Sequence, residues 1–578
     1  MLVAMVAMRT LPILMLLMAA CGSDPAVDPD AGADATPPDA YVDLSGPLFE
    51  PNHIVEVAIE LPVARWDALR MQTRTFNSVI EGRCLDQPIP SPFTTYAAKV
   101  VVDGTTLPHV GIKKKGFFGS LDAVKPSLKI TVDEYTKGAE YLGLEKLTLN
   151  NSHQDPSYVR QCLAYQLFAK AGIVVPRCNF AHVRVNGADL GIYVNVETID
   201  HKLTRRRFAD GTGPLYEGTL SDFRTTWVNT FDPKGKGDGT DLGGIVNVLE
   251  TATDAQLVSA LAPHLDVDAF TTYWAMEIIA NHWDGYANDK NNYFVYHDPT
   301  SGKLQFIPWG VDATFQPGVT FDGIGATNGP VAVAAAGVIA NRLFQIPAAR
   351  TAFINRQREL LANVFDDTAL KAEVARMEAL IAPIVDATQG AGWHGEVGAV
   401  RTFVTNRRAI LSAALDAGPT WTKPLDGYPC LDVIARVQGT FSTTYGTLGA
   451  ANPLATGAGT FTITIGGVTS TLTPVGSTAG TDPNAADKSV VQIYGLRASD
   501  NHVFALSVAS PKMYFFPREV TVGFFDGSGA LFEYNPTTNM TAVVGFALGQ
   551  VTLTQASTTA GGVVAGSFSS NADQPGTP

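Results

Sequence analysis

Residues 281–315 contain the side chains best suited to chemistry in this chain. An acid, Asp284, follows an apolar helical run, and the amide-rich stretch 288–292 comes directly after it. Two short apolar runs around a turn then predict a β-hairpin, which leads into Trp-Gly-Val-Asp with Asp312 as the last residue. Such a hairpin would bring the two acids together. Phosphoryl transfer requires this set of groups: a carboxylate near the attacking hydroxyl, and an amide and a second carboxylate to hold Mg²⁺.

The residue types suggest a separate role for each group. Asp284 is the candidate catalytic residue, because a carboxylate can orient or deprotonate a substrate hydroxyl. Asn292 is the first choice for an amide ligand of the metal, with Asn288 and Asn291 as alternatives, since asparagine also suits turns. Asp312 is the candidate carboxylate ligand of the same metal. The structural alternative is that Asp284 is an acid at the end of a helix or in a loop and that the asparagines form turns.

Six segments, in the same order along the chain, carry a resemblance to a known family. They are residues 113–130 (KKKGFFGSLDAVKPSLKI), 147–160 (LTLNNSHQDPSYVR), 164–176 (AYQLFAKAGIVVP), 183–200 (VRVNGADLGIYVNVETID), 215–218 (LYEG) and 284–315. The chain resembles the spore coat protein H (CotH-type) kinase family, atypical kinases with a diverged protein-kinase-like fold. The resemblance covers residues 55–420, more than half of the chain. It implies ATP and Mg²⁺ as cofactors, with Mn²⁺ as the alternative metal.

The resemblance implies phosphate-binding residues on the first of these segments. The family tends to have Arg-Gly where this chain has Lys115 and Gly116, and lysine keeps the charge of arginine without its forked geometry. Gly116 would let the backbone approach a phosphate. Lys125 and Lys129 resemble the family's strand lysines, and Lys129, which lies within the predicted strand, is preferred for a phosphate contact. A solvated basic edge is the structural alternative.

Two further positions bear on activity. Glu197, which ends GIYVNVE, matches a recurrent acid of the family. By analogy it pairs with a phosphate-contacting lysine; a structural ion pair is the alternative. The family usually carries Trp-Asp-x-Asp where this chain has Trp-Gly-Val-Asp, so Gly310 replaces the first acid. The site is impaired if that first acid is the principal Mg²⁺ ligand, and it survives if Asp312 has that role.

The N-terminus predicts export. Residues 1–21 contain one arginine, a short apolar run and Ala-Ala before Cys21, which resembles a bacterial lipoprotein signal with lipid attached to that thiol. An ordinary secretory signal is the alternative. Residues 22–48, rich in Asp, Ala and Pro, are expected to form a disordered tether. We therefore expect a cell-envelope protein, an outer-membrane or cell-surface lipoprotein anchored to the membrane at Cys21, or otherwise a secreted protein.

Charge and cysteine content limit the other classes. The net charge of −14 argues against a nucleic-acid partner, which requires a basic surface. Beside Cys21 the chain has Cys84, Cys162, Cys178 and Cys430, an even number that permits two disulfides in an exported protein. Cys162 and Cys178 flank a predicted helix and turn, and they are the first choice for one pair.

The order of predicted elements is α+β, with a sheet-rich half followed by a helix-rich half within residues 49–428. One helix is expected to be capped by Asp155 or Ser157 and to run to residue 171. Residues 435–578 are rich in Thr, Gly, Val and Ser in short alternating runs, which predict an all-β sandwich domain. Together with the resemblance, this predicts a diverged protein-kinase-like two-lobed domain followed by a β-sandwich.

The function indicated is that of an exported atypical protein kinase, which transfers the ATP γ-phosphate to Ser or Thr of envelope or secreted proteins. The alternative is a catalytically impaired CotH-like surface binding protein or adhesin, whose C-terminal domain contacts a glycan or another surface ligand. A structural coat or envelope component is the third interpretation. Binding of ATP and metal would separate the first interpretation from the other two.

Overall fold

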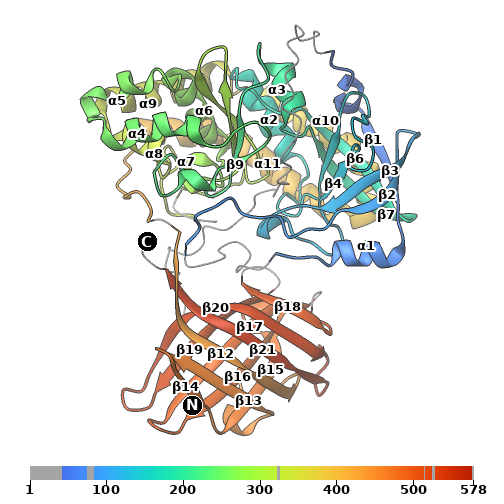
Figure 1. The fold of residues 1–578 in the computed structure, drawn as a ribbon, viewed down its shortest axis with the longest axis vertical. Coiled ribbons are helices and arrows are strands. Elements are labelled where there is room, and N and C mark those ends of the chain that lie inside the picture. The colour runs from blue at the N-terminus through green and yellow to red at the C-terminus, as the bar shows by residue number, and fades with distance from the viewer. Residues whose placement is uncertain are drawn as a thin grey trace. The chain divides into compact units, whose positions relative to one another are not determined.

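The computed structural model (Figure 1) describes residues 42–74, 84–321, 326–427, 429–512, 515–523 and 527–575. These residues form two domains. The larger domain contains residues 42–72 and 86–426, and the smaller domain contains residues 73–74, 84–85 and the chain from 427 onward. The predicted signal sequence and Cys21 lie outside the described residues.

Alternating apolar residues in the first half of the larger domain form a closed seven-stranded sheet, the strand lobe. Its strands are β1 (Ile54–Glu60), β2 (Tyr96–Val102), β3 (Thr105–Lys114), β4 (Leu128–Thr131), β5 (Lys146–Asn150), β6 (Cys178–Val185) and β7 (Ala188–Val196), with helix α1 (Val63–Arg70) after β1. The order is β1-β2-β3-β4-β5-β7-β6, and β6 pairs in parallel with β1. Ile112, Leu128 and Ile130 belong to the core of this lobe. Because strand residues alternate, the intervening Lys113 and Lys129 point to the opposite face.

The second half of the larger domain is mainly helical, which confirms the predicted α+β order. Its helices are α3 (His201–Arg207), α4 (Gly243–Thr251), α5 (Asp254–Leu261), α6 (Val267–Ala280), α7 (Tyr286–Asp289), α8 (Val338–Gln345), α9 (Pro347–Asn363), α10 (Asp367–Gln389) and α11 (His394–Asp416). Helix α6 is buried on nearly all sides, and its Trp274 stacks on Phe353 of α9 with ring centroids 3.6 Å apart. None of the helices in the described ranges combines the length and the apolar character that a membrane span requires.

A small sheet connects the helices to the candidate residues. It has the order β11-β10-β8-β9, formed by β8 (Leu215–Gly218), β9 (Asp232–Pro233), β10 (Tyr293–Asp298) and β11 (Lys303–Pro308). The predicted hairpin is confirmed, since Tyr293 pairs with Pro308 at its open end. Just beyond that pair, the amide of Trp309 donates to the carbonyl oxygen of Asn292 at 3.0 Å. The two ends of the predicted motif therefore meet.

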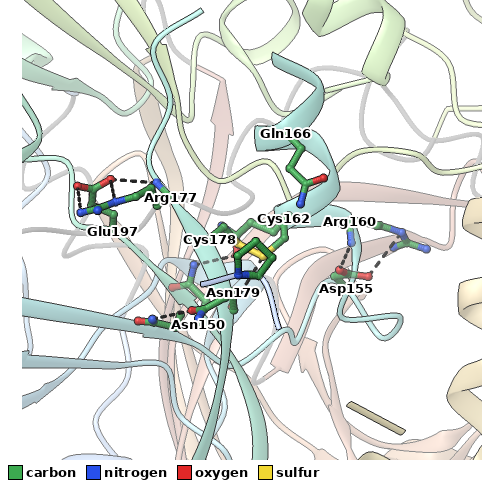
Figure 2. The surroundings of a disulfide bond; sticks show 12 residues. Asn150, Asp155, Arg160, Cys162, Gln166, Arg177, Cys178, Asn179 and Glu197 are labelled. Carbon is green, nitrogen blue, oxygen red and sulfur yellow. Dashed lines mark hydrogen bonds and ion pairs between the residues drawn. A yellow bond between two sulfur atoms is a disulfide. The ribbon is translucent and has the colours of Figure 1, made fainter. Parts of the chain in front are cut away.

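Helix α2 (Arg160–Lys170) begins later than predicted. Its N-cap is Val159, not Asp155 or Ser157, because Tyr158 has a φ of 64° and a helix cannot continue through that conformation. The Asp155 carboxylate still accepts a hydrogen bond from the amide of Arg160 at 2.8 Å. The helix is tied to β6 by a disulfide between Cys162 and Cys178, as predicted (Figure 2).

The described part of the chain begins at residue 42, before the expected end of the tether. Residues Gly46–Phe49 form a 3₁₀ turn, and Leu48 and Phe49 are buried. Asn179 donates to the carbonyl oxygen of Leu48 at 2.9 Å. The tether was predicted to reach residue 48, but its last residues are part of the fold, because Leu48 and the adjacent Phe49 pack in the core of the strand lobe.

The smaller domain is all-β, as predicted. Its strands are β12 (Leu431–Thr444), β13 (Ala458–Ile465), β14 (Val468–Thr471), β15 (Val475–Asp482), β16 (Ala485–Arg497), β17 (His502–Pro511), β18 (Arg518–Gly523), β19 (Gly527–Asn535), β20 (Met540–Gln555) and β21 (Val563–Pro575). They form one ten-stranded sheet and not the two separate sheets of a sandwich. The sheet curls until β15 lies against β12 and β13, and its apolar face encloses the core. A second disulfide, Cys84–Cys430, lies in this domain.

Candidate active site

The turn that carries Asp284 is held by a buried acid of α6. Glu277 lies in the apolar stretch of that helix and has no exposed surface. Its carboxylate accepts hydrogen bonds from the backbone amides of Tyr286 and Ala287, both at 2.9 Å, and from the hydroxyl of Tyr273 at 3.0 Å. These bonds satisfy amides at the start of α7 and fix the connection between the two helices.

Asp284 is the centre of a group that we call the amide cluster, formed by Asp284, Asn291 and Asn292. One carboxylate oxygen accepts a hydrogen bond from the amide of Asn291 at 3.0 Å, and the other accepts one from Asn292 at 2.8 Å. Burial raises the pKa of Asp284 well above its usual range, and the charges of Asp289 and Asp312 raise it further, against the effect of the two amides. A carboxylate in this environment is a suitable proton acceptor.

The structure separates Asn288 from the other two asparagines considered as metal ligands. Asn288 donates to the carbonyl oxygen of Trp283 at 2.8 Å and to Asp289 at 3.2 Å, so its amide serves the turn. Asn291 and Asn292 both reach Asp284. The Oδ1 atom of Asn292 is buried and has no hydrogen-bond partner among the described residues. The oxygen of Asn292, which lies beside the backbone of Gly310, is thus available to a cation, and Asn292 stays the first choice for the amide ligand.

Asp312 is half-buried and has charged neighbours from three parts of the chain. Burial raises the pKa of Asp312 to about 6, and the charge of Asp155 raises it, whereas His282 and Lys115 lower it. Asp312 also raises the pKa of Asp284. The hairpin thus brings the two predicted acids into one electrostatic environment, as the sequence analysis expected.

Lys115 brings the strand lobe into this site. It follows β3 and is buried, with its Nζ atom 2.5 Å from Oδ1 of Asn150 and 5.7 Å from the ring centroid of Trp309. Asn150 in turn donates to the Oε1 atom of Gln161 in α2 at 3.1 Å. Since Trp309 directly precedes Gly310, this lysine belongs to the same site as Asp312.

The donor set fits a cation that shares its coordination with a ligand. Oxygen atoms of Asn292 and Asp312 are the kind of donor that Mg²⁺ prefers. Within the described part of the chain, no three His, Cys, Asp or Glu side chains lie close enough to hold a metal by themselves. Mg²⁺ is commonly bound by one or two carboxylates together with substrate phosphates, and these residues fit that mode.

Gly310 leaves the room that the Asn292 amide occupies. Gly310 has a φ of 52°, and a Cβ atom there would lie 2.3 Å from Oδ1 of Asn292. We expect Gly310→Asp, which supplies the missing family acid, to push this amide away from Asp284. The free energy of unfolding, measured by urea denaturation, should fall by about 1–3 kcal/mol through the lost hydrogen bond and the left-handed backbone.

Gly318→Asp is the matched control for this prediction. Gly318 also has a left-handed φ, of 75°, but nothing lies within 4 Å of its Cβ position. It should therefore lose only the part of the stability that comes from backbone conformation. Equal losses in the two variants would show that Gly310 makes no room for Asn292.

A separate basic cluster lies on the face of the strand lobe opposite its core. Lys113 of β3 and Lys129 of β4 stand directly opposite each other, and both are buried. Burial lowers the pKa of Lys129 to about 7 and that of Lys113 to about 8, and neighbouring lysines contribute. One of these neighbours, Lys234, forms an ion pair with Glu217 at 3.1 Å. Lys115 is the lysine beside the acids, and Lys129 belongs to this second cluster.

Lys125 and Gly116 lie in the loop between β3 and β4. The Nζ atom of Lys125 donates to the hydroxyl of Tyr158 at 3.1 Å and lies 4.6 and 5.1 Å from the ring centroids of Tyr158 and Tyr193. Burial lowers the pKa of Lys125 to about 7, against the charge of Asp122. Gly116 has a φ of 121°, a conformation that favours glycine. The predicted phosphate loop therefore has its glycine turn, whereas Lys125 contacts tyrosines.

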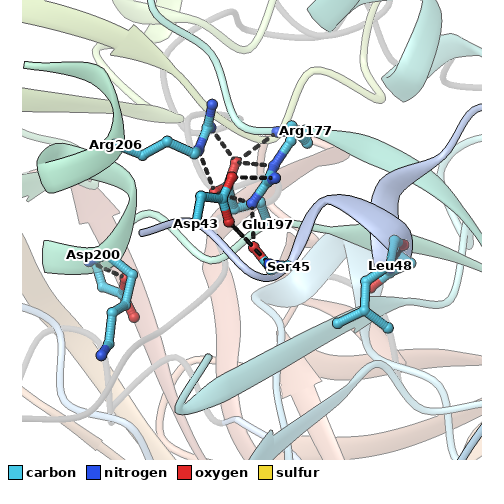
Figure 3. A network of polar contacts seen from close by, with 9 residues as sticks. Asp43, Ser45, Leu48, Arg177, Glu197, Asp200 and Arg206 are labelled. Carbon is cyan, nitrogen blue, oxygen red and sulfur yellow. Dashed lines mark hydrogen bonds and ion pairs between the residues drawn. The ribbon is translucent and has the colours of Figure 1, made fainter. Parts of the chain in front are cut away.

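Glu197 forms the structural ion pair that was one of its two expected roles. Its buried carboxylate pairs with Arg177 at 2.8 Å and accepts a hydrogen bond from Arg206 at 3.0 Å (Figure 3). Arg177 also binds Asp43 at 2.8 Å and the hydroxyl of Ser45 at 2.7 Å. No lysine is among the partners that the described residues give Glu197, so we do not assign it to the cofactor site.

Three residues of the site were not predicted as such. Asn150 holds Lys115, Asp155 lies near Asp312, and Glu277 supports the turn before α7. From the sequence, Asp155 was interpreted only as a helix cap, a role that depends on neighbouring residues and does not indicate a contact with Asp312. The sequence does contain a signal for Glu277: an acid inside an apolar helix is buried and needs hydrogen-bond donors close to it.

The strand lobe, the mainly helical second half and the site with its acids, amides and lysine suit an atypical kinase-like protein, and the family match supports that class. Residues 112–411 match the family model described as CotH kinase protein. This is more than half of the chain, and the chain belongs to that family.

The relatives and the solved structure that match this chain differ in how much they cover. Inner spore coat protein H of Bacillus subtilis is 27% identical over 30% of this chain and 51% of that protein. Spore coat protein homolog 1 and Invasin CotH7 of Rhizopus delemar are 23% and 22% identical, over 41% of this chain and 41% and 42% of those proteins. The matches thus span about half the length of these relatives or less. The proinflammatory kinase CtkA of Helicobacter pylori is similar over 51% of this chain and 92% of that chain, with a TM-score of 0.26 and 7% identity.

Proposed function

We propose that this chain is an exported atypical protein kinase, which transfers the γ-phosphate of ATP to Ser or Thr hydroxyls of envelope or secreted proteins. Membership of the CotH kinase family supports the kinase part. The observation that carries the proposal is the Asn292 side chain. Its nitrogen donates to Asp284, while its buried oxygen lies without a partner among the described residues, next to Gly310. One amide thus connects the candidate proton acceptor to the candidate metal site.

The residues of the site have separate tasks in this proposal. Asp284 accepts the proton of the substrate hydroxyl while the hydroxyl oxygen bonds to the γ-phosphorus and the bond from that phosphorus to ADP breaks. Asn291 and Asn292 keep the carboxylate oriented through two hydrogen bonds. Lys115 neutralises charge on the transferred phosphoryl group from the strand lobe, and Lys129 does so for the rest of the nucleotide.

The metal part of the proposal rests on two oxygen donors. Asp312 and the Oδ1 atom of Asn292 would hold Mg²⁺, with Mn²⁺ as the alternative. When bound, the ion neutralises negative charge on the nucleotide phosphates. Gly310 contributes no donor, so Asp312 carries the carboxylate role alone.

The buried acids and lysines favour a ligand that combines positive and negative charge, as Mg²⁺ with ATP does. Burial raises the pKa of Asp284 and Asp312 in the acid site and lowers the pKa of Lys113 and Lys129 in the separate basic cluster, so the charged forms of both groups are disfavoured without a ligand. We expect Mg²⁺ with ATP to raise Tm more than either alone. At about 100 times Kd the gain is about 2.7 kcal/mol, or several degrees, by differential scanning fluorimetry. No shift, or the same shift with Mg²⁺ alone, would contradict the proposal.

Export is supported by the two disulfides, Cys84–Cys430 and Cys162–Cys178, because such bonds persist in oxidising compartments. The names of the relatives, spore coat proteins and an invasin, also suit an envelope or surface protein. We propose a lipid anchor at Cys21, followed by a tether, as the attachment to the membrane. Exported proteins are the proposed substrates, and the net charge of −14 argues against a nucleic-acid partner.

Gly310 favours one alternative, a catalytically impaired surface binding protein or adhesin of the same family. In that case the first acid of the family motif is the essential metal ligand, and Asp312 cannot replace it. The smaller domain would then carry the function by contacting a glycan or another surface ligand. The thermal-shift experiment separates the two proposals, because the alternative predicts no joint effect of Mg²⁺ and ATP.

A further inference from the structure

The segment that leads out of the larger domain returns to the amide cluster. Helix α11 ends at Asp416, and residues 417–426 connect it to the smaller domain. Asp426, the last residue of the larger domain, has its Oδ2 atom 2.5 Å from the Nζ atom of Lys290. The guanidinium of Arg224 donates to the carbonyl oxygen of the same residue at 2.8 Å. Side chain and backbone of Asp426 are therefore both held.

Lys290 directly precedes Asn291 and is completely buried. It has a φ of 56°, and its carbonyl oxygen accepts a hydrogen bond from the amide of Ser221 at 2.9 Å. Its ammonium lies 5.7 Å from the ring centroid of Trp227. A change in the position of Lys290 would move the backbone from which the two asparagines reach Asp284.

Three carboxylates lie around this ammonium. Lys290 lowers the pKa of Asp222 and of Asp289, so both are near it. Their oxygens accept hydrogen bonds from other groups, the amide of Val338 for Asp222 and the side chain of Asn288 for Asp289. In the described part of the chain, the ion pair of Lys290 at hydrogen-bonding distance is the one with Asp426. A buried ammonium needs such a partner, because its desolvation is otherwise uncompensated.

We propose that Asp426 is a positioning residue for the phosphoryl transfer: its ion pair with Lys290 holds the backbone of the amide cluster. The inference rests on the proposed function. Asp426 lies beyond residues 112–411, which match the family model, so the matched region alone does not contain it. The residue that fixes the amide cluster is also the one at which the chain leaves the larger domain.

The test compares Asp426→Asn with the wild-type chain in two measurements. Asparagine keeps the size of the side chain and removes its charge. We expect kcat for γ-phosphate transfer to fall by about 10- to 100-fold with KM for ATP unchanged, since small displacements of catalytic groups have effects of this size. Hydrogen–deuterium exchange in residues 284–292 should become faster. Asp426→Glu, which keeps the charge, should recover most of kcat and of the protection.

Asp416→Asn is the matched control, because the ion pair of Asp416 with Arg358 lies on the exposed surface. It should change neither measurement. Unchanged exchange in Asp426→Asn overturns the inference, and so does faster exchange without loss of kcat in an active chain. If Asp426→Asn does not fold, Arg224→Met carries the test: it removes the hydrogen bond to the carbonyl oxygen of Asp426, so it should also lower kcat and speed exchange in residues 284–292, and no change in either overturns the inference. If the wild-type chain transfers no phosphate, the proposed function is contradicted instead. Hydrogen–deuterium exchange in residues 284–292 then decides by itself whether Asp426 holds the amide cluster.

Discussion

Asp284→Asn is expected to lower the rate of γ-phosphate transfer by at least about 100-fold while ATP and Mg²⁺ still bind. Asparagine has the size of aspartate but cannot accept the hydroxyl proton. Its NH₂ group would also face the amide of Asn291 or Asn292, so one buried hydrogen bond is lost, at about 1–3 kcal/mol in the free energy of unfolding. The measurement is incorporation of radiolabelled phosphate into the protein itself and into a generic Ser-rich acceptor.

Asp298→Asn is the control for this prediction. Asp298 lies at the turn end of the β10–β11 hairpin, where its carboxylate accepts hydrogen bonds from the amide of Thr300 and the hydroxyl of Ser301. An asparagine oxygen can accept in the same way, so transfer should stay at the wild-type rate. Transfer by Asp284→Asn at a rate comparable to that of the control would remove Asp284 from the mechanism.

Asp312→Asn is expected to abolish transfer for a different reason, the loss of the metal. The asparagine lacks the charge that holds Mg²⁺ beside Asn292, so the part of the Tm increase that depends on Mg²⁺ should disappear. The part that depends on ATP alone should remain, because Lys115 and Lys129 are unchanged. Asp284→Asn should show the opposite pattern, with the Mg²⁺-dependent increase retained. Retention of that increase in Asp312→Asn would assign the metal to other donors.

The raised pKa of Asp312 adds a pH dependence to this prediction. The folded chain binds a proton at Asp312 up to pH about 6, whereas an unfolded aspartate releases it near pH 4. The contribution of Asp312 to the free energy of unfolding therefore falls as pH rises from about 4 to about 6. Asp312→Asn should lack this contribution in urea denaturation series. The Mg²⁺-dependent Tm increase of the wild type should weaken as pH falls through about 6.

Local patterns predicted most of the fold. The hairpin over β10 and β11 followed from alternation and a turn signal, and its register alone brings Asp312 back to the amide cluster. The pairing of Cys162 with Cys178 followed from a short helix and turn between them. By contrast, β15 (Val475–Asp482) was not predicted. Its sequence is Val-Gly-Ser-Thr-Ala-Gly-Thr-Asp, and small buried residues give no hydrophobic alternation.

The contacts between distant segments could not be predicted in the same way. The preference for Lys129 rested on its place within a strand, yet Lys115, just beyond a strand end, is the lysine that reaches Trp309 and Asn150. Glu197 ends a strand that matches the family, but its partners come from residues 177 and 206, and no sequence spacing indicates them. Which side chains meet across the two lobes depends on tertiary packing.

The central claim, that this chain is a kinase, is tested most directly by transfer of radiolabelled γ-phosphate from ATP to the chain from residue 22 onward and to a Ser-rich acceptor. The assay is run with Mg²⁺ or Mn²⁺, beside Asp284→Asn and Asp312→Asn. The account predicts metal-dependent incorporation by the wild type and its loss in both variants. Absence of transfer by the wild type, together with no joint Tm effect of Mg²⁺ and ATP, would contradict it and favour the surface binding protein.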